Sequence, residues 1–307
     1  MSAFVPPEAA PAIQIERACF AFAGRRLFDQ LSLQLPAGQT TCLLGPSGVG
    51  KTSLLRLIAG LLPPEPPTQI RAGDGRPLAG RVAWMAQTDL LMPWLDVLGN
   101  VLVGFRLRGD AAAFEAARGR ALDLLARTGL AGRQGDMPAT LSGGMRQRVA
   151  LARTLVEERP VVLMDEPFGQ LDAITRLSLQ DLAARMLAGR TVLLVTHDPL
   201  EAARLGHRIH VMAGAPATLG MPLEPAGSPP RDATAGETLA IQAELMRRLA
   251  DAHAFASDNH LPPLAGDGGA QRRMGVVGAT TPASVADRNA ATPIRPSGTF
   301  PSERGKV

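Results

Sequence analysis

The sequence is poor in aromatic residues and in cysteine. It has no tyrosine, aromatic residues make up 4% of its 307 positions, and there are 2 cysteines. Cys19 and Cys42 both lie in apolar, strand-like runs, so we expect two small buried side chains and neither a disulfide nor a metal site. Both thiols should be chemically inert.

Long apolar runs are also absent. No stretch approaches the roughly 20 consecutive apolar residues that a membrane-spanning helix needs. Residues 1–11 lack the basic and then apolar pattern of a secretory signal. We therefore expect the chain to remain in the cytoplasm.

Charge of one sign is not concentrated anywhere in the chain. The net charge is +4 and the pI is near 9.9, but the arginines are scattered and no long block of like charges occurs. This pattern is typical of a solvated surface, so we expect no nucleic-acid partner. A hydrophobic content of 46% is sufficient for a globular chain with one large core or two smaller ones.

The sequence does contain a phosphate-loop motif, G-x-x-x-x-G-K-T, at residues 45–52. It lies between a strand-like run at 40–44 and apolar residues at helical spacing over 54–62. Glycines allow backbone N–H groups to approach a polyphosphate, and the helix N-terminus favours an anion. We predict that Lys51 reaches the β- and γ-phosphates of a nucleoside triphosphate and that the Thr52 hydroxyl binds Mg²⁺. The predicted nucleotide contacts here are Gly45, Pro46, Ser47, Gly48, Val49, Gly50, Lys51, Thr52 and Ser53.

Two carboxylates follow a second strand-like run. The apolar residues 161–164 predict a buried parallel strand that ends at Asp165 and Glu166. Open α/β sheets bind ligands at this edge. We predict that Asp165 binds Mg²⁺ and that Glu166 is the general base that activates the attacking water.

A second anion site is predicted at residues 141–148. Ser142 suits a helix N-cap, Gly143 and Gly144 leave the helix N-terminus open, and Met145 and Val149 begin an apolar face. Another strand-like run, at 191–195, leads to His197.

Taken in order, these motifs resemble those of the ATP-binding-cassette (ABC) ATPases. Residues 45–52 are similar to the Walker A motif of that family, Gln87 to the Q-loop, 141–147 to the signature motif, 161–166 to Walker B, 171–172 to the D-loop and His197 to the switch histidine. The similarity runs from about residue 13 to 223. It implies an α/β P-loop NTPase fold, with a RecA-like core sheet, an antiparallel β subdomain and an inserted helical subdomain at about 88–150.

The remaining segments are assigned from composition and pattern. Residues 1–12 form an N-terminal extension, and 68–78 are expected to be a turn-rich excursion. Residues 224–256 are expected to carry a helix from about 235 to 254, and 257–307 a disordered tail. The apolar stripe of that helix is predicted to be Leu239, Gln242, Leu245, Met246 and Leu249.

The resemblance also implies roles for individual residues. In the family, two cassettes form a head-to-tail dimer, and each ATP lies between the phosphate loop of one and the signature helix of the other. Ser142, Gly143, Gly144 and Asp172 are thus expected to contact the nucleotide of a second, identical subunit. Gln87 is expected to join Thr52 and Asp165 around Mg²⁺ and to contact the nucleotide, and His197 to hold the γ-phosphate beside Glu166. Phe22 is expected to stack on adenine where the family often has tyrosine, with Phe20 as the alternative.

The same resemblance suggests a transport role. The apolar segment 90–95 is expected to dock on an integral membrane permease; the alternative is that Trp94 packs in the core. The motifs are most similar to importer ATPases of the nitrate, sulfonate, taurine and thiamine-precursor types. We therefore expect an ATPase subunit at the cytoplasmic face of the inner membrane, working with a permease and indirectly with a periplasmic binding protein. A soluble non-transport ATPase and an exporter ATPase are the alternatives.

Overall fold

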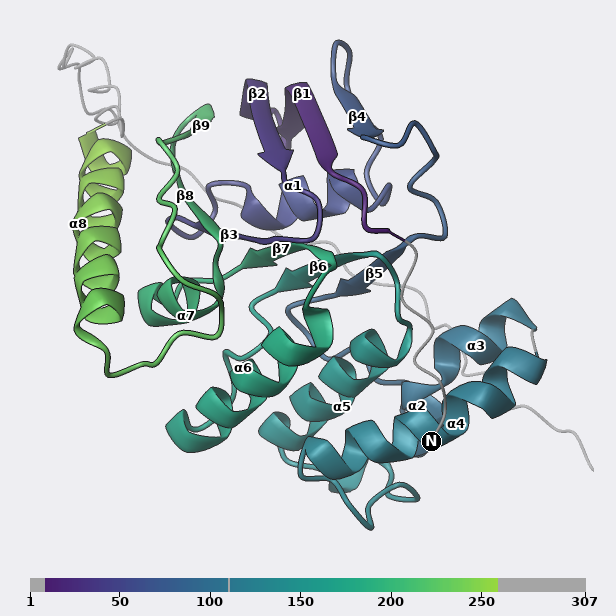
Figure 1. Ribbon diagram of the computed structural model, residues 1–307. Coiled ribbons are helices and arrows are strands. Elements are labelled where there is room, and N and C mark those ends of the chain that lie inside the picture. The colour runs from purple at the N-terminus through teal and green to yellow at the C-terminus, as the bar shows by residue number, and fades with distance from the viewer. Residues whose placement is uncertain (1–8, 110, 259–307) are drawn as a thin grey trace, which may run out of the picture. The chain divides into compact units, whose positions relative to one another are not determined.

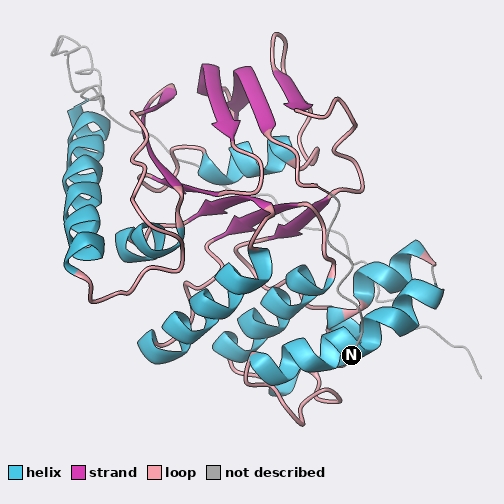
Figure 2. Ribbon diagram, in the orientation of Figure 1, coloured by secondary structure: helices cyan, strands magenta, loops and turns pink. Residues whose placement is uncertain are grey.

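A mixed β-sheet forms the centre of the fold (Figures 1 and 2). The computed structural model describes residues 9–109 and 111–258. Within them the strands lie in the order β4-β1-β2-β9-β8-β3-β7-β6-β5. Strands β3, β5, β6, β7 and β8 run parallel, whereas β1 pairs antiparallel with β2 and β4. The strands are β1 Ile13–Phe22, β2 Arg25–Leu35, β3 Thr40–Leu44, β4 Gln69–Ala72, β5 Val82–Met85, β6 Val161–Asp165, β7 Thr191–Val195, β8 Arg208–Gly214 and β9 Ala217–Leu219.

Helices cover both faces of the parallel strands. Because side chains alternate along a strand, each strand contributes to two cores. Leu43 of β3 belongs to a buried cluster with Leu54 and Leu55 of α1, whereas Cys42 and Leu44 belong to a cluster on the other face, with α5, α6 and α7. Figure 1 shows these helices on opposite sides of β3, β6 and β7. The helices are α1 Lys51–Ile58, α2 Val97–Val101, α3 Val103–Arg108, α4 Ala111–Arg127, α5 Gly143–Val156, α6 Ala173–Leu187, α7 Pro199–Leu205 and α8 Gly236–Asp258.

The segment between β5 and β6 is helical. Helices α2, α3 and α4 pack with α5 away from the antiparallel strands (Figure 2). Ala117, Ala121, Leu124 and Leu125 of α4 are buried. A 3-10 turn at Pro138–Thr140 then leads to the start of α5. This arrangement places residues 141–144 at the junction of the helical segment and the sheet.

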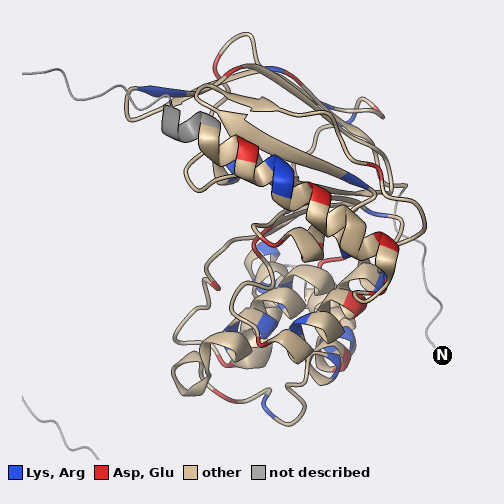
Figure 3. Cartoon of the chain, turned by 90° about the vertical axis from the view of Figure 1, so that its left-hand side faces the viewer, with Lys and Arg blue, Asp and Glu red and all other residues tan. Residues whose placement is uncertain are grey.

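Arg231 attaches the C-terminal segment to α7. Its guanidinium donates hydrogen bonds to five backbone carbonyl oxygens, two at the end of α7 and three in the turn before α8. Arg204 of α7 returns a hydrogen bond to the Arg231 carbonyl at 3.0 Å. Helix α8 then packs on α7 and β8, with charged residues on its exposed face (Figure 3). The five accepting carbonyls belong to Ala203, Gly206, Pro225, Ala226 and Gly227.

Two expectations from the sequence need correction. The excursion at 68–78 contains a strand, β4, which pairs with β1. Ile70 and Ala72 lie two residues apart on one face of β4, and both pack in the same apolar cluster as residues of β1. The predicted stripe of α8 is partly wrong, since Leu239 and Met246 are exposed, whereas Thr238, Leu245 and Ala252 are buried. The buried positions recur every seven residues, because only a narrow face of α8 meets β8 and α7. The helix also continues to Asp258, and the rest of the predicted tail lies outside the described residues.

Both cysteines are buried and unpaired, as predicted. Burial raises the pKa of the Cys42 thiol far above its usual value, so this side chain remains a neutral apolar group. Among residues 9–109 and 111–258, no helix has the length and apolarity needed to cross a membrane.

Candidate nucleotide-binding and hydrolysis site

The phosphate loop joins β3 to α1 at the carboxyl edge of the parallel strands. Gly50, the N-cap of α1, has a φ of 113°, and a Cβ there would lie 2.7 Å from the ring of Phe28. Gly45 has a φ of 151°, and a Cβ there would overlap the Met212 carbonyl oxygen. Both glycines are thus required by the fold around the loop as well as by any phosphate that approaches it.

Lys51 begins α1 and turns back over the loop. Its Nζ donates hydrogen bonds to the carbonyl oxygens of Gly45 at 2.7 Å and Pro46 at 2.9 Å. Burial lowers the pKa of Lys51, while the nearby carboxylates of Glu166 and Asp165 raise it. Lys51 is therefore largely withdrawn from water. Because water screens a buried charge less, a positive charge on Nζ attracts an anion more strongly.

A hollow of about 590 Å³ opens in front of the loop. Phe22 is on its wall with 66% of its surface exposed, whereas Phe20 is buried at 7%. The geometry thus favours Phe22 over Phe20 as the stacking residue. Arg25 and Leu27 of β2 also line the hollow, and the sequence had not singled them out. The other lining residues are Ala23, Ser47, Gly48, Gly50, Lys51, Thr52, Ser53, Gln87 and Glu166.

Three predicted loop contacts are absent from this lining set within the described residues. Gly45 and Pro46 turn their carbonyls to Lys51, and Val49 is buried in the core. The two carbonyls and the buried Val49 side chain shape the loop, so any contact of these residues with a nucleotide would come from their backbone. Sequence alone did not separate these two kinds of position.

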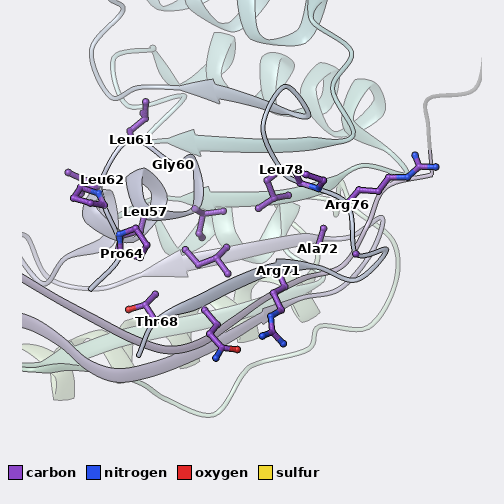
Figure 4. A pocket seen from close by; sticks show the side chains of 16 residues that line it. Leu57, Gly60, Leu61, Leu62, Pro64, Thr68, Arg71, Ala72, Arg76 and Leu78 are labelled. Carbon is purple, nitrogen blue, oxygen red and sulfur yellow. The ribbon is translucent and has the colours of Figure 1, made fainter. Parts of the chain in front are cut away.

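A wider hollow, of about 950 Å³, lies at the other end of α1 (Figure 4). Its wall is made by the end of α1, strand β4 and the turn that follows, and Leu57, Leu61 and Leu78 are among its apolar side chains. None of the described residues that line it was predicted to bind nucleotide or to act in catalysis. Size alone would therefore not have pointed to the hollow in front of the phosphate loop.

Asp165 ends β6 beside Thr52. The Thr52 hydroxyl donates a hydrogen bond to Asp165 Oδ2 at 2.7 Å. Burial raises the pKa of Asp165, and the hydrogen bond from Thr52 opposes this. Together with the amide oxygen of Gln87, which lines the same hollow as Thr52, the Thr52 hydroxyl and the Asp165 carboxylate would give an all-oxygen donor set. Such a set fits Mg²⁺, which is usually held by one or two carboxylates together with substrate phosphates.

The Glu166 carboxylate contacts two other residues that the sequence predicted for the site. Its Oε2 accepts a hydrogen bond from Gln87 Nε2 at 3.2 Å and lies 3.3 Å from His197 Nδ1. Its φ is 49°, a left-handed conformation that is costly for a residue with a side chain. The backbone is held in this conformation because Glu166 N donates to the Val195 carbonyl at 2.9 Å. Strain that the surroundings impose in this way is typical of functional positions.

Gln147 is a functional candidate that the sequence did not reveal. It lies on α5, is 4% exposed, and donates from Nε2 to the carbonyl of Glu166 at 3.1 Å. Its Oε1 accepts from Gln170 N at 2.8 Å. Gln147 therefore joins the helix that begins at the signature motif to the strained backbone of Glu166 and to Gln170, just before the D-loop. A polar residue among apolar ones on the buried side of α5 was the available signal.

The predicted contacts to a second subunit lie apart from this hollow. Ser142 is the N-cap of α5 and its side chain accepts from Met145 N. Asp172 caps α6 by accepting from Thr175 N, and this hydrogen bond lowers the pKa of Asp172. Among the described residues that line the 590 Å³ hollow, none belongs to 142–144 or 172. A nucleotide in this hollow would thus not meet these four residues of the same chain.

A buried carboxyl lies just after the switch histidine. Glu201 of α7 is 3% exposed, and its Oε1 has no hydrogen-bond partner among the described residues. Burial raises the pKa of Glu201 to about 8, the charge of Asp198 raises it further, and hydrogen bonds from Thr196 and Gln180 oppose this. The folded protein therefore keeps a proton on Glu201 at pH values where the unfolded chain has lost it.

Glu201→Gln should stabilise the protein at alkaline pH. Because the folded pKa is raised, the wild type loses stability as pH rises from the usual carboxyl pKa of 4.5 through about 8. Glutamine does not titrate, so the free energy of unfolding of the variant should rise by about 1–3 kcal/mol relative to that of the wild type across this range. The melting temperature of the variant should rise by several degrees relative to that of the wild type. Melting temperatures at pH 5.5 and 8.5 provide the test. An equal difference between the two proteins at both pH values would contradict it.

Comparison with known proteins agrees with this geometry. Residues 28–169 match a family model described as ABC transporter. An aliphatic sulfonates import ATP-binding protein (SsuB 1) of Mesorhizobium japonicum is 39% identical over 256 residues, which cover 80% of this chain and 94% of that protein. Another of that name, from Rhodococcus jostii, is 49% identical over 187 residues, covering 60% and 71%. An uncharacterized ABC transporter ATP-binding protein of Haemophilus influenzae is 39% identical over 241 residues, covering 77% and 98%.

A solved structure confirms the predicted α/β P-loop NTPase fold. The dimeric structure of an ATP-binding cassette in a post-hydrolysis state, bound to ADP and Pi, superimposes with a TM-score of 0.61 and 26% identity. The match covers 70% of this chain and 99% of that cassette. With the phosphate loop, the paired carboxylates and the switch histidine at one edge of the sheet, the chain belongs to the ATP-binding subunits of ABC transporters and is an ATPase.

Proposed function

We propose that this chain is the ATP-hydrolysing subunit of an importer, and that it binds Mg-ATP in the 590 Å³ hollow. Phe22 would stack on the adenine ring, and the phosphate loop with Lys51 would bind the phosphates. Thr52, Asp165 and Gln87 would hold Mg²⁺, which neutralises phosphate charge when bound. The single observation that carries the proposal is the convergence of Gln87, Glu166 and His197 at the edge of this hollow.

Hydrolysis follows from the position of the Glu166 carboxylate. Water attacks the γ-phosphorus, Glu166 accepts a proton from it, and the bond to the β-phosphate oxygen breaks. His197 and Gln87 contact Oε2 of this carboxylate at 3.3 and 3.2 Å, and His197 would also share a hydrogen bond with the γ-phosphate. Positioning of this kind restricts the water to an in-line approach.

Two copies of the chain would complete the site. Ser142, Gly143 and Gly144 stand at the open N-terminus of α5, where backbone N–H groups favour an anion. They do not line the chain's own hollow, which supports their use on the nucleotide of a second subunit. ATP would then hold the two subunits together, and hydrolysis would release them.

The transport partner would dock on residues 89–96, here called the docking loop. Trp94 is 71% exposed and Leu90 is 54% exposed, so the alternative in which Trp94 packs in the core is wrong. Large apolar side chains presented together on a loop are typical of an interaction site. An integral permease at the cytoplasmic face of the inner membrane is the proposed partner, working with a periplasmic binding protein. The names of the relatives support aliphatic sulfonates as the imported substrate.

Copurification tests the importer proposal. Tagged protein extracted from membranes of its native host with mild detergent should carry an integral permease, identified by mass spectrometry. Trp94→Asp should lose that permease, because a charge replaces the most exposed aromatic of the docking loop. Met221→Asp is a matched control, since Met221 is 81% exposed outside that loop. Recovery of soluble partners only, or equal permease recovery with Trp94→Asp, would overturn the proposal.

A further inference from the structure

The docking loop is held rigidly at its C-terminal end. Asn100 of α2 is fully buried, and its side chain makes hydrogen bonds to the loop backbone that water would make at an exposed position. Its Oδ1 accepts from Met92 N at 2.7 Å, and its Nδ2 donates to the carbonyls of Leu95 at 2.9 Å and Asp96 at 3.0 Å. A buried amide with its polar atoms satisfied fixes the turn that presents Trp94.

The other end of the docking loop is held by two arginines from α5. Arg153 donates to the carbonyls of Asp89 at 2.6 Å and Leu90 at 2.9 Å. Arg146 Nε forms an ion pair with Asp89 Oδ2 at 3.0 Å. Burial lowers the pKa of Arg153, and the charge of Asp89 opposes this, so the contact is partly desolvated and stronger than a surface pair.

The backbone of Leu90 depends on this contact. Its φ is 47°, a left-handed conformation that is unfavourable for a residue with a side chain. The hydrogen bond from Arg153 to its carbonyl compensates for that cost and leaves the Leu90 side chain pointing outward. The shape of the docking loop is therefore set from α5 as well as from its own sequence.

Helix α5 reaches the signature motif as well. Arg146, which binds Asp89, also donates to the Leu141 carbonyl at 2.8 Å, immediately before the N-cap Ser142. One guanidinium thus contacts both the docking loop and the start of the signature motif. Arg146 and Arg153 lie on the same unbroken helix, α5, which has 14 residues.

We propose that Asp89, Arg146 and Arg153 form a clamp that makes the docking loop move with α5. When Ser142–Gly144 close on the ATP of the second subunit, α5 moves and displaces the docking loop. A partner bound to the docking loop changes the position of the signature motif in return. The effect must be reciprocal because both ligands bias the same rigid element. The inference rests on the proposed ATP-dependent dimer, and these three residues act as positioning residues that do not touch the nucleotide.

Trp94 can report on this movement directly. The chain has 2 tryptophans, so Trp84→Phe leaves Trp94 as the only one. In a Glu166→Gln background, ATP should produce a dimer seen by light scattering together with a change in Trp94 emission and acrylamide quenching. With Asp89→Asn or Arg153→Met added, the dimer should still form, but the change in Trp94 signal should fall at least about threefold.

Arg120→Met is the control. Arg120 lies on α4 and forms an ion pair with Glu158 at 3.3 Å, outside the docking loop and outside residues 141–148. Its Trp94 response should equal that of the parent. Asp89→Asn keeps the acceptor for Leu91 N, so the test stands even if Arg153→Met fails to fold. A full Trp94 response in the clamp variants would overturn the clamp alone, as would a dimer of the parent that forms without any Trp94 response. If the parent forms no dimer, the proposed function is overturned and the clamp with it.

Discussion

Replacing Glu166 with glutamine should lower ATP turnover by about 10²–10⁴ while leaving ATP binding intact. The amide has nearly the same shape as the carboxylate and can still meet Gln87 and His197, but it cannot accept the proton of the attacking water. ATP then remains between two subunits, and the dimer accumulates. Steady-state phosphate release and light scattering with and without ATP measure the two effects.

A matched control separates this effect from a general loss of charge. Glu115 lies on the exposed surface of α4, so Glu115→Gln should retain wild-type turnover. Turnover of Glu166→Gln at the wild-type rate would exclude Glu166 as the general base. A fall in turnover without an ATP-dependent dimer would leave the base in place but contradict the shared nucleotide site.

The parts of the site that lie on parallel strands could be predicted from sequence. Strands β3, β6 and β7 are buried on both faces, so each reads as an apolar run, and a predicted site residue lies at its end or within a few residues of it. Parallel strands end at the same edge of the sheet, and Thr52, Asp165 and His197 follow three such strands. The N-cap at Ser142 was predictable for a similar reason, because capping chemistry is local.

The parts that depend on distant packing could not be predicted. Gln147 reads as one more polar residue in a helix, and only the fold shows that it meets the Glu166 carbonyl. Arg25 reaches the nucleotide hollow because the tip of β2 turns over the phosphate loop, and nothing local to its sequence indicates this. In α8 the apolar residues outnumber the buried positions, since the face that packs is chosen by β8 and α7. Periodicity therefore found the helix but not its buried side.

Lys51→Ala should weaken ATP binding by about 10–100-fold, because a charge-assisted hydrogen bond in a partly buried site contributes roughly 1.5–3 kcal/mol. Lys51 is 8% exposed, so water does not screen its charge effectively. The predicted contacts are with the β- and γ-phosphates, and the affinity for ATP should therefore fall by a larger factor than the affinity for ADP. Calorimetry with EDTA present, so that no ATP is hydrolysed, measures both affinities.

The comparison of ATP with ADP also separates two roles of Lys51. Its Nζ holds the carbonyls of Gly45 and Pro46, so alanine removes support for the loop as well as a cation. Collapse of the loop alone would weaken ATP and ADP equally, whereas loss of a cation near the γ-phosphate penalises ATP more. Arg56→Ala, at the exposed end of the same helix, should leave both affinities unchanged. Unchanged ATP affinity in Lys51→Ala would remove Lys51 from the nucleotide site, and equal losses for ATP and ADP would restrict it to shaping the loop.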